Sequence, residues 1–462
     1  MGMSLRRTQI RPQIPTQRMT CSADAERILG EPSRSRVRHP LDWRRRQGWV
    51  APHCRPHDPQ VIRKLRSPLA IVFLTLLLDK LGENIVYPLL PFILEKFSPD
   101  GLTLGLLAST ATLFSVLASP IIGSLSDACG RRPVILLCVA INCLSLFMFG
   151  LAGTLGLIFL SRAINGVSTA TVGTAQAYIS DISTPANRAR NFGISGAAFG
   201  LGAIAGPALG GALVGFGMRI PVFVAAALAA YNFLMAFLYL KETLPLQNRP
   251  RFQWSQINGL APVMALLALP KANRVALAFC CFNFAFSGFT TLLVLYLKDQ
   301  FSWSASQSSG IFVIVGLTVT YVQVALTGPL VRRHGEARLN IYGLVAVAAG
   351  IALIPLARVF GAAAAVVIVA AAVMLSVGAA CVIPTARSLV SRLVPENRQG
   401  VMLGSLLAIT GLASALGPML AGVLYDLSPT LCFLLQALVC LLGAPLLRGV
   451  REPAAVPVDI GD

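Results

Sequence analysis

The sequence predicts an all-α membrane protein with 12 transmembrane helices in two pseudo-symmetric six-helix bundles. Its composition, its apolar segments and an internal repeat support this prediction. Hydrophobic residues make up 55% of the chain and charged residues only 12%, whereas a soluble domain has about 25% charged residues because its surface meets water. The composition therefore assigns the chain to the membrane class before any motif is considered.

Twelve segments are long enough to cross the membrane, which takes about 20 apolar residues in a helix. Ten of them are free of charge, and two contain charged residues in an otherwise apolar stretch. Helices are expected because an open sheet would leave backbone groups unpaired in lipid, and the segments are too long for barrel strands. In chain order the segments are 67–94, 101–126, 133–161, 156–181, 191–218, 220–240, 275–297, 300–331, 339–357, 359–386, 399–425 and 427–447.

Lys and Arg are concentrated in every second connecting segment, which is typical of cytoplasmic loops. We therefore expect both termini in the cytoplasm and a multi-pass protein of the plasma or inner membrane. The alternate connecting segments, which would lie outside, carry only Lys96, Arg219, Lys298 and Arg358.

Much of the net charge of +19 comes from residues 1–66, which hold 14 Arg and one Lys against five acidic residues. We interpret this segment as a basic, disordered cytoplasmic tail. An organellar transit peptide and an over-extended start of translation are the alternatives, and the missing apolar h-region excludes a secretory signal. The remaining charge follows the loop pattern, so no nucleic-acid partner is expected.

Cysteine and histidine give no sign of a metal centre. Eight of the 10 Cys lie in or beside the apolar segments, where Cys serves as a small apolar residue. His53, Cys54 and His57 lie close together in the tail but lack a second cluster. We therefore expect neither a metal nor a cofactor.

An internal repeat divides the chain into two halves. "GSLSDACGRRP" begins at Gly123 and "GPLVRRHGEAR" at Gly328, and "STPANRARNFG" in the first half matches "LVPENRQGVMLG" in the second. Duplicated bundles are typical of transporters that work by alternating access. The predicted bundles span 67–241 and 273–448, with a cytoplasmic connector at 242–272 and a cytoplasmic tail at 449–462.

Five motifs resemble the major facilitator superfamily, over roughly residues 67 to 448. "GSLSDACGRRP" is similar to its loop pattern G-x-L-x-D-x-x-G-R-R. "LDKLGENIVYPLLP", "LSRAINGVSTAT", "PANRARNFG" and "FGLGAIAGPALGG" resemble motifs of its tetracycline/proton antiporter-like drug efflux branch. The resemblance implies the major facilitator fold, with a central cavity lined by spans 1, 4, 7 and 10.

The residue types in "GSLSDACGRRP" are compatible with a role as a conformational gate. Gly123 and Gly130 permit close backbone approach and tight turning. Asp127 can face the positive end of a neighbouring helix, which contributes about 0.3–1 kcal/mol. The resemblance implies that this helix is the eleventh span, which begins near Gly400.

The resemblance also implies an ion pair between Arg131 and Asp181 at the end of the fourth span. Arg188, in the matching loop "PANRARNFG", is assigned to the same gate. Such contacts would hold one conformation until a charge elsewhere changes. A loop that only sets the topology is the alternative.

The fifth span carries small residues on a smooth face, which lets membrane helices approach closely. Pro207 is expected to bend or loosen that helix. Packing alone would explain the pattern, whereas the resemblance implies an antiporter hinge between the bundles. The residues assigned to it are Gly202, Gly206, Pro207, Gly210 and Gly211.

The first span contains Asp79, Lys80 and Glu83, although an ionisable group at bilayer depth costs about 2.5–3.5 kcal/mol on insertion scales. Asp79 and Glu83 are four residues apart, hence on one helical face, and two such close acids do not readily ionise together. The resemblance places Arg162 opposite them. We assign proton coupling to Asp79, Glu83 and Arg162, with a static cluster of buried ion pairs as the alternative.

The second half has almost no charge within its spans, and its polar residues lie among aromatic ones. Such a wall suits a largely apolar ligand with a few polar anchors. The tetracycline branch also carries acids in its third and ninth helices, but Ser145 stands where the first would fall, so tetracycline itself is not the expected substrate. The cavity candidates are Asn165, Asn283, Ser287, Tyr296, Tyr321 and Gln323.

Together these patterns predict a monomeric secondary transporter that exports amphipathic small molecules in exchange for protons. Uptake or facilitated passage of a polar metabolite is one alternative, and it predicts transport that ignores the proton gradient. A non-transporting membrane sensor with the same fold is another. No nucleophile elbow or phosphate loop is present, so no enzymatic activity is expected.

Overall fold

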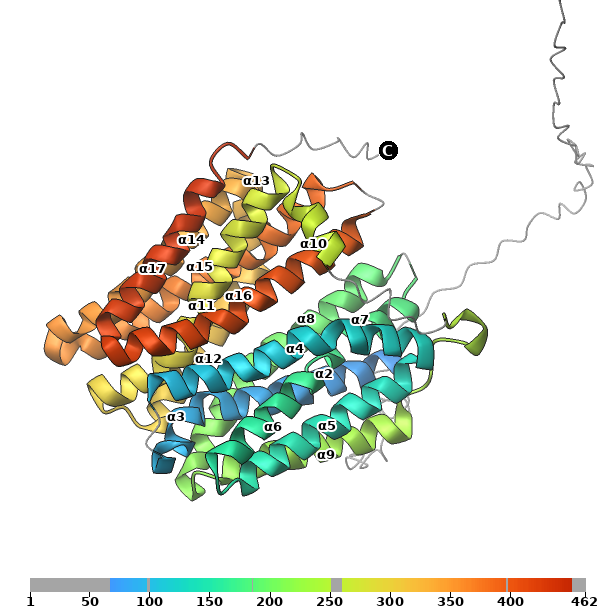
Figure 1. Cartoon of the computed structure of the whole chain (residues 1–462), viewed down its shortest axis with the longest axis horizontal. Coiled ribbons are helices and arrows are strands. Elements are labelled where there is room, and N and C mark those ends of the chain that lie inside the picture. Colours follow the sequence, from blue (N-terminus) through green and yellow to red (C-terminus); the bar gives the residue numbers. More distant parts are fainter. Residues whose placement is uncertain (1–66, 98–99, 185, 251–259, 396–397, 451–462) are drawn as a thin grey trace, which may run out of the picture. The chain divides into compact units, whose positions relative to one another are not determined.

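A computed structural model describes residues 67–97, 100–184, 186–250, 260–395 and 398–450. All regular structure in these residues is helical, which confirms the all-α prediction. Figure 1 shows two groups of helices, one from each half of the sequence. The first group contains α2 (Pro68–Val86), η1 (Tyr87–Leu89), α3 (Leu90–Ile93), η2 (Glu95–Phe97), α4 (Gly101–Cys129), α5 (Arg131–Leu151), α6 (Leu155–Ser168), α7 (Thr171–Asp181), α8 (Arg188–Leu213), η3 (Val214–Phe216) and α9 (Ile220–Tyr239).

The second half repeats this arrangement after a connector. The connector contains η4 (Leu246–Asn248) and α10 (Leu260–Leu267). The second group contains α11 (Ala272–Phe301), α12 (Ala305–Tyr321), the π-helix η6 (Val322–Leu326), α13 (Thr327–His334), α14 (Glu336–Leu356), η7 (Ala357–Ala363), α15 (Ala364–Leu393), α16 (Gln399–Leu427) and α17 (Pro429–Leu446).

These helices correspond to the 12 predicted spans. Ten helical stretches are long and apolar enough to cross a membrane, and one of them, 336–393, covers both α14 and α15. The first span, α2, is not among the ten, and it contains three charged residues, Asp79, Lys80 and Glu83. The fold is therefore the predicted one of 12 helices in two bundles. The proposed tail at 1–66 lies outside the described residues, as does most of the tail at 449–462.

Local sequence explains where several helices begin. Asp100, Thr154, Ser304 and Ser428 each precede a helix, and each side chain accepts a hydrogen bond from a backbone N–H of the first turn. Such N-caps satisfy donors that have no partner within the helix. The hydrogen bond from Thr103 holds the pKa of Asp100 below its usual range.

The repeated loop motif has the same backbone geometry in both halves. Gly130, between α4 and α5, has φ +106°, and Gly335, between α13 and α14, has φ +81°. Residues with a Cβ rarely adopt this region. The structure therefore supports the duplication through two equivalent turns that are built on glycine.

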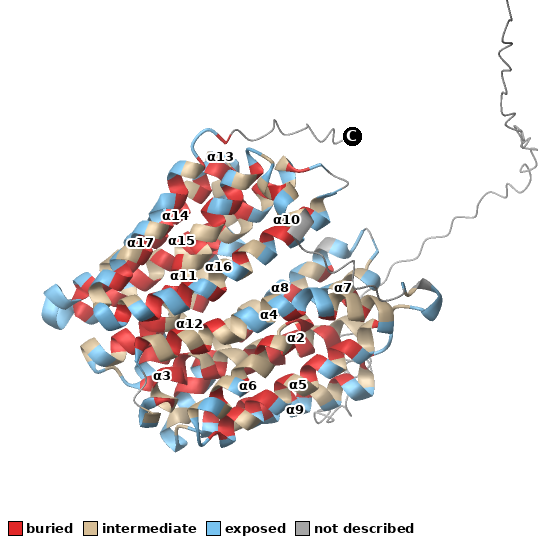
Figure 2. Ribbon diagram, viewed as in Figure 1, coloured by how far each residue is buried: buried red, intermediate tan, exposed pale blue. Residues whose placement is uncertain are grey.

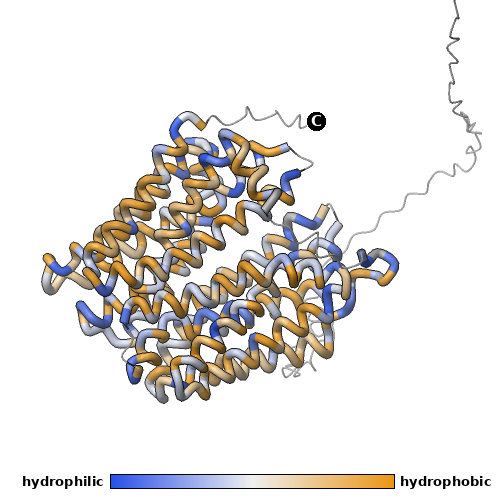
Figure 3. The backbone as a smooth tube through the Cα atoms, in the orientation of Figure 1, coloured by the Kyte–Doolittle hydropathy of each residue, from blue (hydrophilic) through white to orange (hydrophobic). Residues whose placement is uncertain are grey.

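The surface matches a lipid environment. Large apolar side chains such as Leu144, Phe147 and Leu238 are exposed. Figure 2 shows exposed residues along the helices of both groups, and Figure 3 shows that these helices are predominantly hydrophobic. Hydrophilic residues are concentrated near the helix ends and loops (Figure 3). Because lipid tails are apolar, exposed leucines on a spanning helix carry little energetic penalty.

Candidate functional site

A cavity of about 370 Å³ lies between the two helix groups. It is lined by residues of α2, η1, α3, α4, α6, α11 and α16, so the expected contribution of spans 1, 4 and 7 is present, whereas α15, the tenth span, contributes none. All charged lining residues come from the first half. The lining consists of Lys80, Glu83, Tyr87, Leu90, Leu107, Ala108, Ala111, Thr112, Ser115, Arg162, Asn165, Thr169, Ser287, Thr291, Ser414 and Pro418.

Lys80 and Glu83 form an ion pair on the cavity wall. The Lys80 Nζ lies 2.5 Å from Glu83 Oε2, and the two side chains are 16% and 39% exposed. Lys80 Nζ also lies 5.6 Å from the centre of the Phe199 ring. The pair neutralises both charges, and it leaves Glu83 accessible from the cavity.

Arg162 contributes a second positive charge to the same cavity. Its guanidinium carbon lies 4.6 Å from the centre of the Phe149 ring, on which it can rest through a cation–π interaction. Its Nε and Nη2 are buried without a hydrogen-bond partner among the described residues. Unpaired buried donors are costly, so this guanidinium is available to an acceptor group of a ligand.

Asp79 does not line this cavity. It is buried, and its Oδ1 accepts a hydrogen bond of 2.8 Å from Asn142 Nδ2 on α5. Asn142 Oδ1 in turn accepts a hydrogen bond of 2.9 Å from Asn165 Nδ2, and Asn165 does line the cavity. A chain of two amides therefore connects the buried carboxyl group with the cavity.

Sequence reasoning did not identify Asn142. Ser145, which stands where the tetracycline branch has an acid, lies one turn further along the same helix and accepts a hydrogen bond of 3.4 Å from Asn165 Nδ2. A buried amide in the third span was a usable signal, since a membrane helix rarely carries a polar side chain without a partner. Neither Asp79 nor Glu83 faces the lipid.

The other cavity candidates are dispersed. Asn165 and Ser287 line the cavity, and Asn283 accepts a 3.5 Å hydrogen bond from the lining residue Ser414. The remaining three do not line it. Tyr296 is packed in the core of the second group, whereas Tyr321 and Gln323 are exposed.

The predicted gate residues gather at the end of the helices that carries Arg131, Arg132 and Arg249, which we call the basic end. The expected ion pair is present, because Arg131 Nε lies 3.1 Å from Asp181 Oδ2. Asp127 pairs with the same guanidinium at 2.5 Å. Arg188 donates to the Ser180 hydroxyl.

Two connector residues extend this cluster. Glu242 accepts hydrogen bonds from the backbone N–H groups of Arg131 and Arg132, at 2.9 and 3.2 Å, and so caps α5. Arg249 lies 3.6 Å from Glu242 and donates to the carbonyl of Cys129 at 2.7 Å. The connector therefore holds the turn at Gly130, which the sequence motif alone did not indicate.

The bundles are joined at the opposite end, which carries Glu95, Gly101 and Lys298. The Lys298 ammonium pairs with Glu95 at 3.1 Å, and Asp426 of α16 accepts from the backbone N–H of Gly101 at 2.7 Å. By contrast, no hydrogen bond or ion pair links Asp127 to α16 within the described ranges. The contact expected near Gly400 is therefore not made in this conformation.

The hinge glycines explain how closely α8 packs. Gly202, Gly206 and Gly210 lie against α2, where an added Cβ would meet Lys80, Asn84 or Ile85 within 3 Å. Gly211 lies against Ser309 of α12, and its carbonyl accepts from Ser306 Oγ at 2.7 Å. The helix thus contacts its own bundle and the other one, and Pro207 lies between Gly206 and Gly210 in this series.

The fold and the site define a membrane transporter with a central cavity. The family model of the Major Facilitator Superfamily matches residues 72–369 and 321–460. The chain belongs to this superfamily, close to its tetracycline and drug efflux branch. It is therefore a multi-pass transporter of small molecules and not an enzyme.

Three similar proteins illustrate this relationship. Tetracycline resistance protein, class G, of Vibrio anguillarum is 31% identical over 400 residues, which cover 83% of this chain and 98% of that protein. Multidrug resistance protein 2 of Bacillus subtilis is 27% identical, with coverage of 85% and 97%. The crystal structure of the human organic anion transporter MFSD10 superimposes with a TM-score of 0.63 at 27% identity, with coverage of 82% and 98%.

Proposed function

We propose that the protein is a monomeric proton-coupled antiporter that exports amphipathic small molecules by alternating access. The protein would lie in the plasma or inner membrane, with the basic end and both termini on the cytoplasmic side. The observation that carries the proposal is the chain from the buried Asp79 through Asn142 and Asn165 to the cavity. A carrier that exchanges a proton for a substrate needs such a link between a proton acceptor and a ligand site.

Asp79 and Glu83 would have different roles in coupling. Asp79, which is shielded from the cavity, would bind the proton. A change in its charge would alter the hydrogen bond from Asn142, and this would in turn alter the position of Asn165 at the cavity wall. Glu83 is accessible from the cavity, so a bound proton and a cationic or neutral amphipathic ligand would compete for it. Competition between proton and substrate is what couples their opposite movements.

Lys80 and Arg162 are the two cations of the cavity in this scheme. Protonation of Glu83 would release Lys80 from its ion pair and leave the cavity more positive. Arg162, whose Nε and Nη2 have no partner among the described residues, would donate to an acceptor oxygen of the substrate. The apolar lining, with Leu90, Leu107 and Ala111, would hold the rest of an amphipathic molecule.

In the conformational change, one end of the cavity would close while the opposite end opens. In the present conformation the end that carries Gly101 and Asp426 is joined, and the contact between Asp127 and α16 is absent. We propose that closure of the basic end brings Asp127 to the start of α16 while the Asp426 contact opens. The glycine face of α8 would serve as the hinge.

The proton-coupled role can be tested in proteoliposomes that contain the purified protein and a pH-sensitive dye. With an imposed pH step, addition of an amphipathic dye such as ethidium should produce proton movement, and Asp79→Asn should abolish it while dye binding remains. Asn232→Ala, which removes another buried amide that contacts α2 but does not line the cavity, serves as the matched control and should retain coupling.

Two results would contradict the proposal. Transport that proceeds equally with and without a pH gradient would favour facilitated passage of a metabolite. Complete absence of flux for a panel of cationic, neutral and anionic amphipaths, with a folded protein, would favour a membrane sensor.

A further inference from the structure

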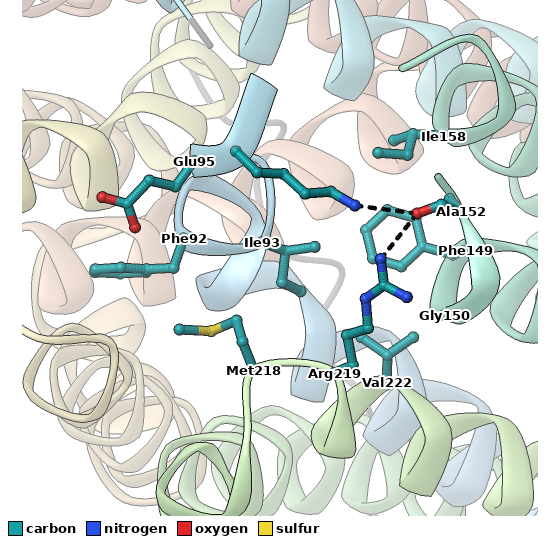
Figure 4. Close-up of a pocket in the computed structure, with 11 residues that line it drawn as sticks. Phe92, Ile93, Glu95, Phe149, Gly150, Ala152, Ile158, Met218, Arg219 and Val222 are labelled. Carbon is teal, nitrogen blue, oxygen red and sulfur yellow. Dashed lines mark hydrogen bonds between the residues drawn. The ribbon is translucent and has the colours of Figure 1, made fainter. Parts of the chain in front are cut away.

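A second cavity, of about 410 Å³, lies within the first bundle at the end opposite the basic end. Figure 4 shows it between the tip of the first span, the turn after α5 and the turn before α9. Its walls are largely apolar, with Phe92, Ile93, Phe149 and Val222 among the lining residues. None of its lining residues lines the central cavity, so the two spaces are separate.

Two positive side chains converge in this cavity. The Lys96 ammonium donates to the carbonyl oxygen of Ala152 at 3.4 Å, and Arg219 Nη2 donates to the same oxygen at 3.2 Å (Figure 4). Two charges that share one acceptor are close neighbours and repel each other. A single neutral carbonyl cannot compensate both.

No carboxylate compensates them within the described part of the chain. Glu95 lines the same cavity, but its carboxylate pairs with Lys298 at 3.1 Å, and Figure 4 shows it pointing away from Arg219. The Lys96 Nζ also lies 4.6 Å from the centre of the Phe97 ring. The mouth of the cavity therefore carries two exposed basic side chains without a carboxylate partner among the described residues.

The sequence makes this convergence unusual. Only four basic residues lie in the segments that alternate with the basic loops, Lys96, Arg219, Lys298 and Arg358. One of them, Lys298, is paired, and two of the others meet at one oxygen. Chance placement of so few charges rarely brings two of them to one cavity.

We infer that this cavity binds the phosphate head group of an anionic phospholipid from the outer leaflet. Arg and Lys hold phosphate oxygens through charge-assisted hydrogen bonds. The position at the helix ends places the two cations at head-group depth, where long basic side chains extend toward the membrane surface. The apolar walls suit the first carbons of an acyl chain.

The test uses the full-length protein in nanodiscs of phosphatidylcholine with phosphatidylglycerol, followed by native mass spectrometry. The wild-type protein should retain one phosphatidylglycerol molecule, and Lys96→Gln/Arg219→Gln should reduce that retention at least fivefold. Arg358→Gln removes an equivalent charge elsewhere on the same side and should retain the lipid as the wild type does. Thermal unfolding in detergent verifies that each variant is folded.

A second arm separates a lipid from a soluble phosphate. Phosphatidylglycerol should raise the melting temperature of the wild-type protein, whereas glycerol 1-phosphate at the same concentration should not. Equal stabilisation by glycerol 1-phosphate would overturn the assignment to a lipid. Equal lipid retention by the double variant and the wild type would overturn the site itself.

Discussion

Asp426, near the end of α16, accepts a hydrogen bond from the backbone N–H of Gly101, the first residue of α4, with an Oδ1–N distance of 2.7 Å. Its other oxygen accepts from Leu102 N–H at 2.9 Å. A side chain of the second bundle therefore caps a helix of the first. Because a helix N-terminus carries partial positive charge, the carboxylate stabilises this closed end electrostatically as well.

Removal of this contact should loosen that end. Loss of a helix cap costs about 0.5–2 kcal/mol, which corresponds to roughly a 2- to 30-fold shift between two conformations. We expect Asp426→Ala to increase the labelling of a cysteine introduced at Ala108, with a membrane-impermeant maleimide applied to the side opposite the basic end, in a protein without other cysteines.

Asp100→Ala provides the control for this experiment. Asp100 caps the same helix through the N–H of Thr103 at 2.8 Å, but it belongs to the first bundle. Its removal should lower helix stability without exposing Ala108. Equal labelling of the Asp100 and Asp426 variants would show that the cross-bundle contact does not hold the conformation.

Asn142 should be necessary for proton coupling. Asn142→Ala removes the hydrogen bond to Asp79 and breaks the chain to Asn165. We expect the protons moved per transported dye molecule to fall at least tenfold, since a charge-assisted hydrogen bond contributes about 1.5–3 kcal/mol, while dye binding persists. Simultaneous recordings of dye flux and internal pH measure this ratio.

Asn232 offers a matched comparison, because it is another buried amide that contacts α2. Its Nδ2 donates to the carbonyl of Thr75 at 3.2 Å. Asn232→Ala should lower stability by a similar amount and leave the ratio of protons to dye unchanged. If the number of protons moved per dye molecule fell in both the Asn142 and the Asn232 variant, coupling would depend only on packing around α2.

The two glycines of the gate motif should respond differently to alanine. Gly130 has φ +106°, and an added Cβ would meet Glu242, so Gly130→Ala should cost about 1–3 kcal/mol. Gly123 has no atom within 4 Å of an added Cβ, so Gly123→Ala should be neutral for stability. Melting temperatures in detergent compare the two, and equal values would contradict the close packing of Glu242 against the turn at Gly130.

Alanine substitutions should also have different effects at two glycines of α8. Gly206→Ala would place a Cβ 2.5 Å from Asn84 Cβ, and such overpacking costs about 1–3 kcal/mol. Gly196, on the same helix, has open space, and Gly196→Ala should be neutral or stabilising by up to about 1 kcal/mol. Transport and melting temperature should both fall only in the Gly206 variant.

Several features of the site followed from sequence motifs. The pairing of Arg131 with Asp181 was expected from the resemblance and is present. The placement of Asn165 and Ser287 on the cavity wall was also expected. Glu242 and Asn142 were missed, since no local pattern marks a glutamate as the cap of a helix more than 100 positions earlier in the sequence, or an amide as the partner of a carboxylate on another span.

Apolar length and repetition are properties of continuous segments, so the membrane class, the 12 helices and their division into two halves could be predicted from the sequence. Which side chains contact one another depends instead on how the helices pack. Asp79 and Glu83 are separated by about 40° around the helix axis. The packing of α2 against α8 and α9 turns Asp79 toward Asn142 of α5 and leaves Glu83 at the cavity. That difference depends on neighbouring helices, which no single segment encodes.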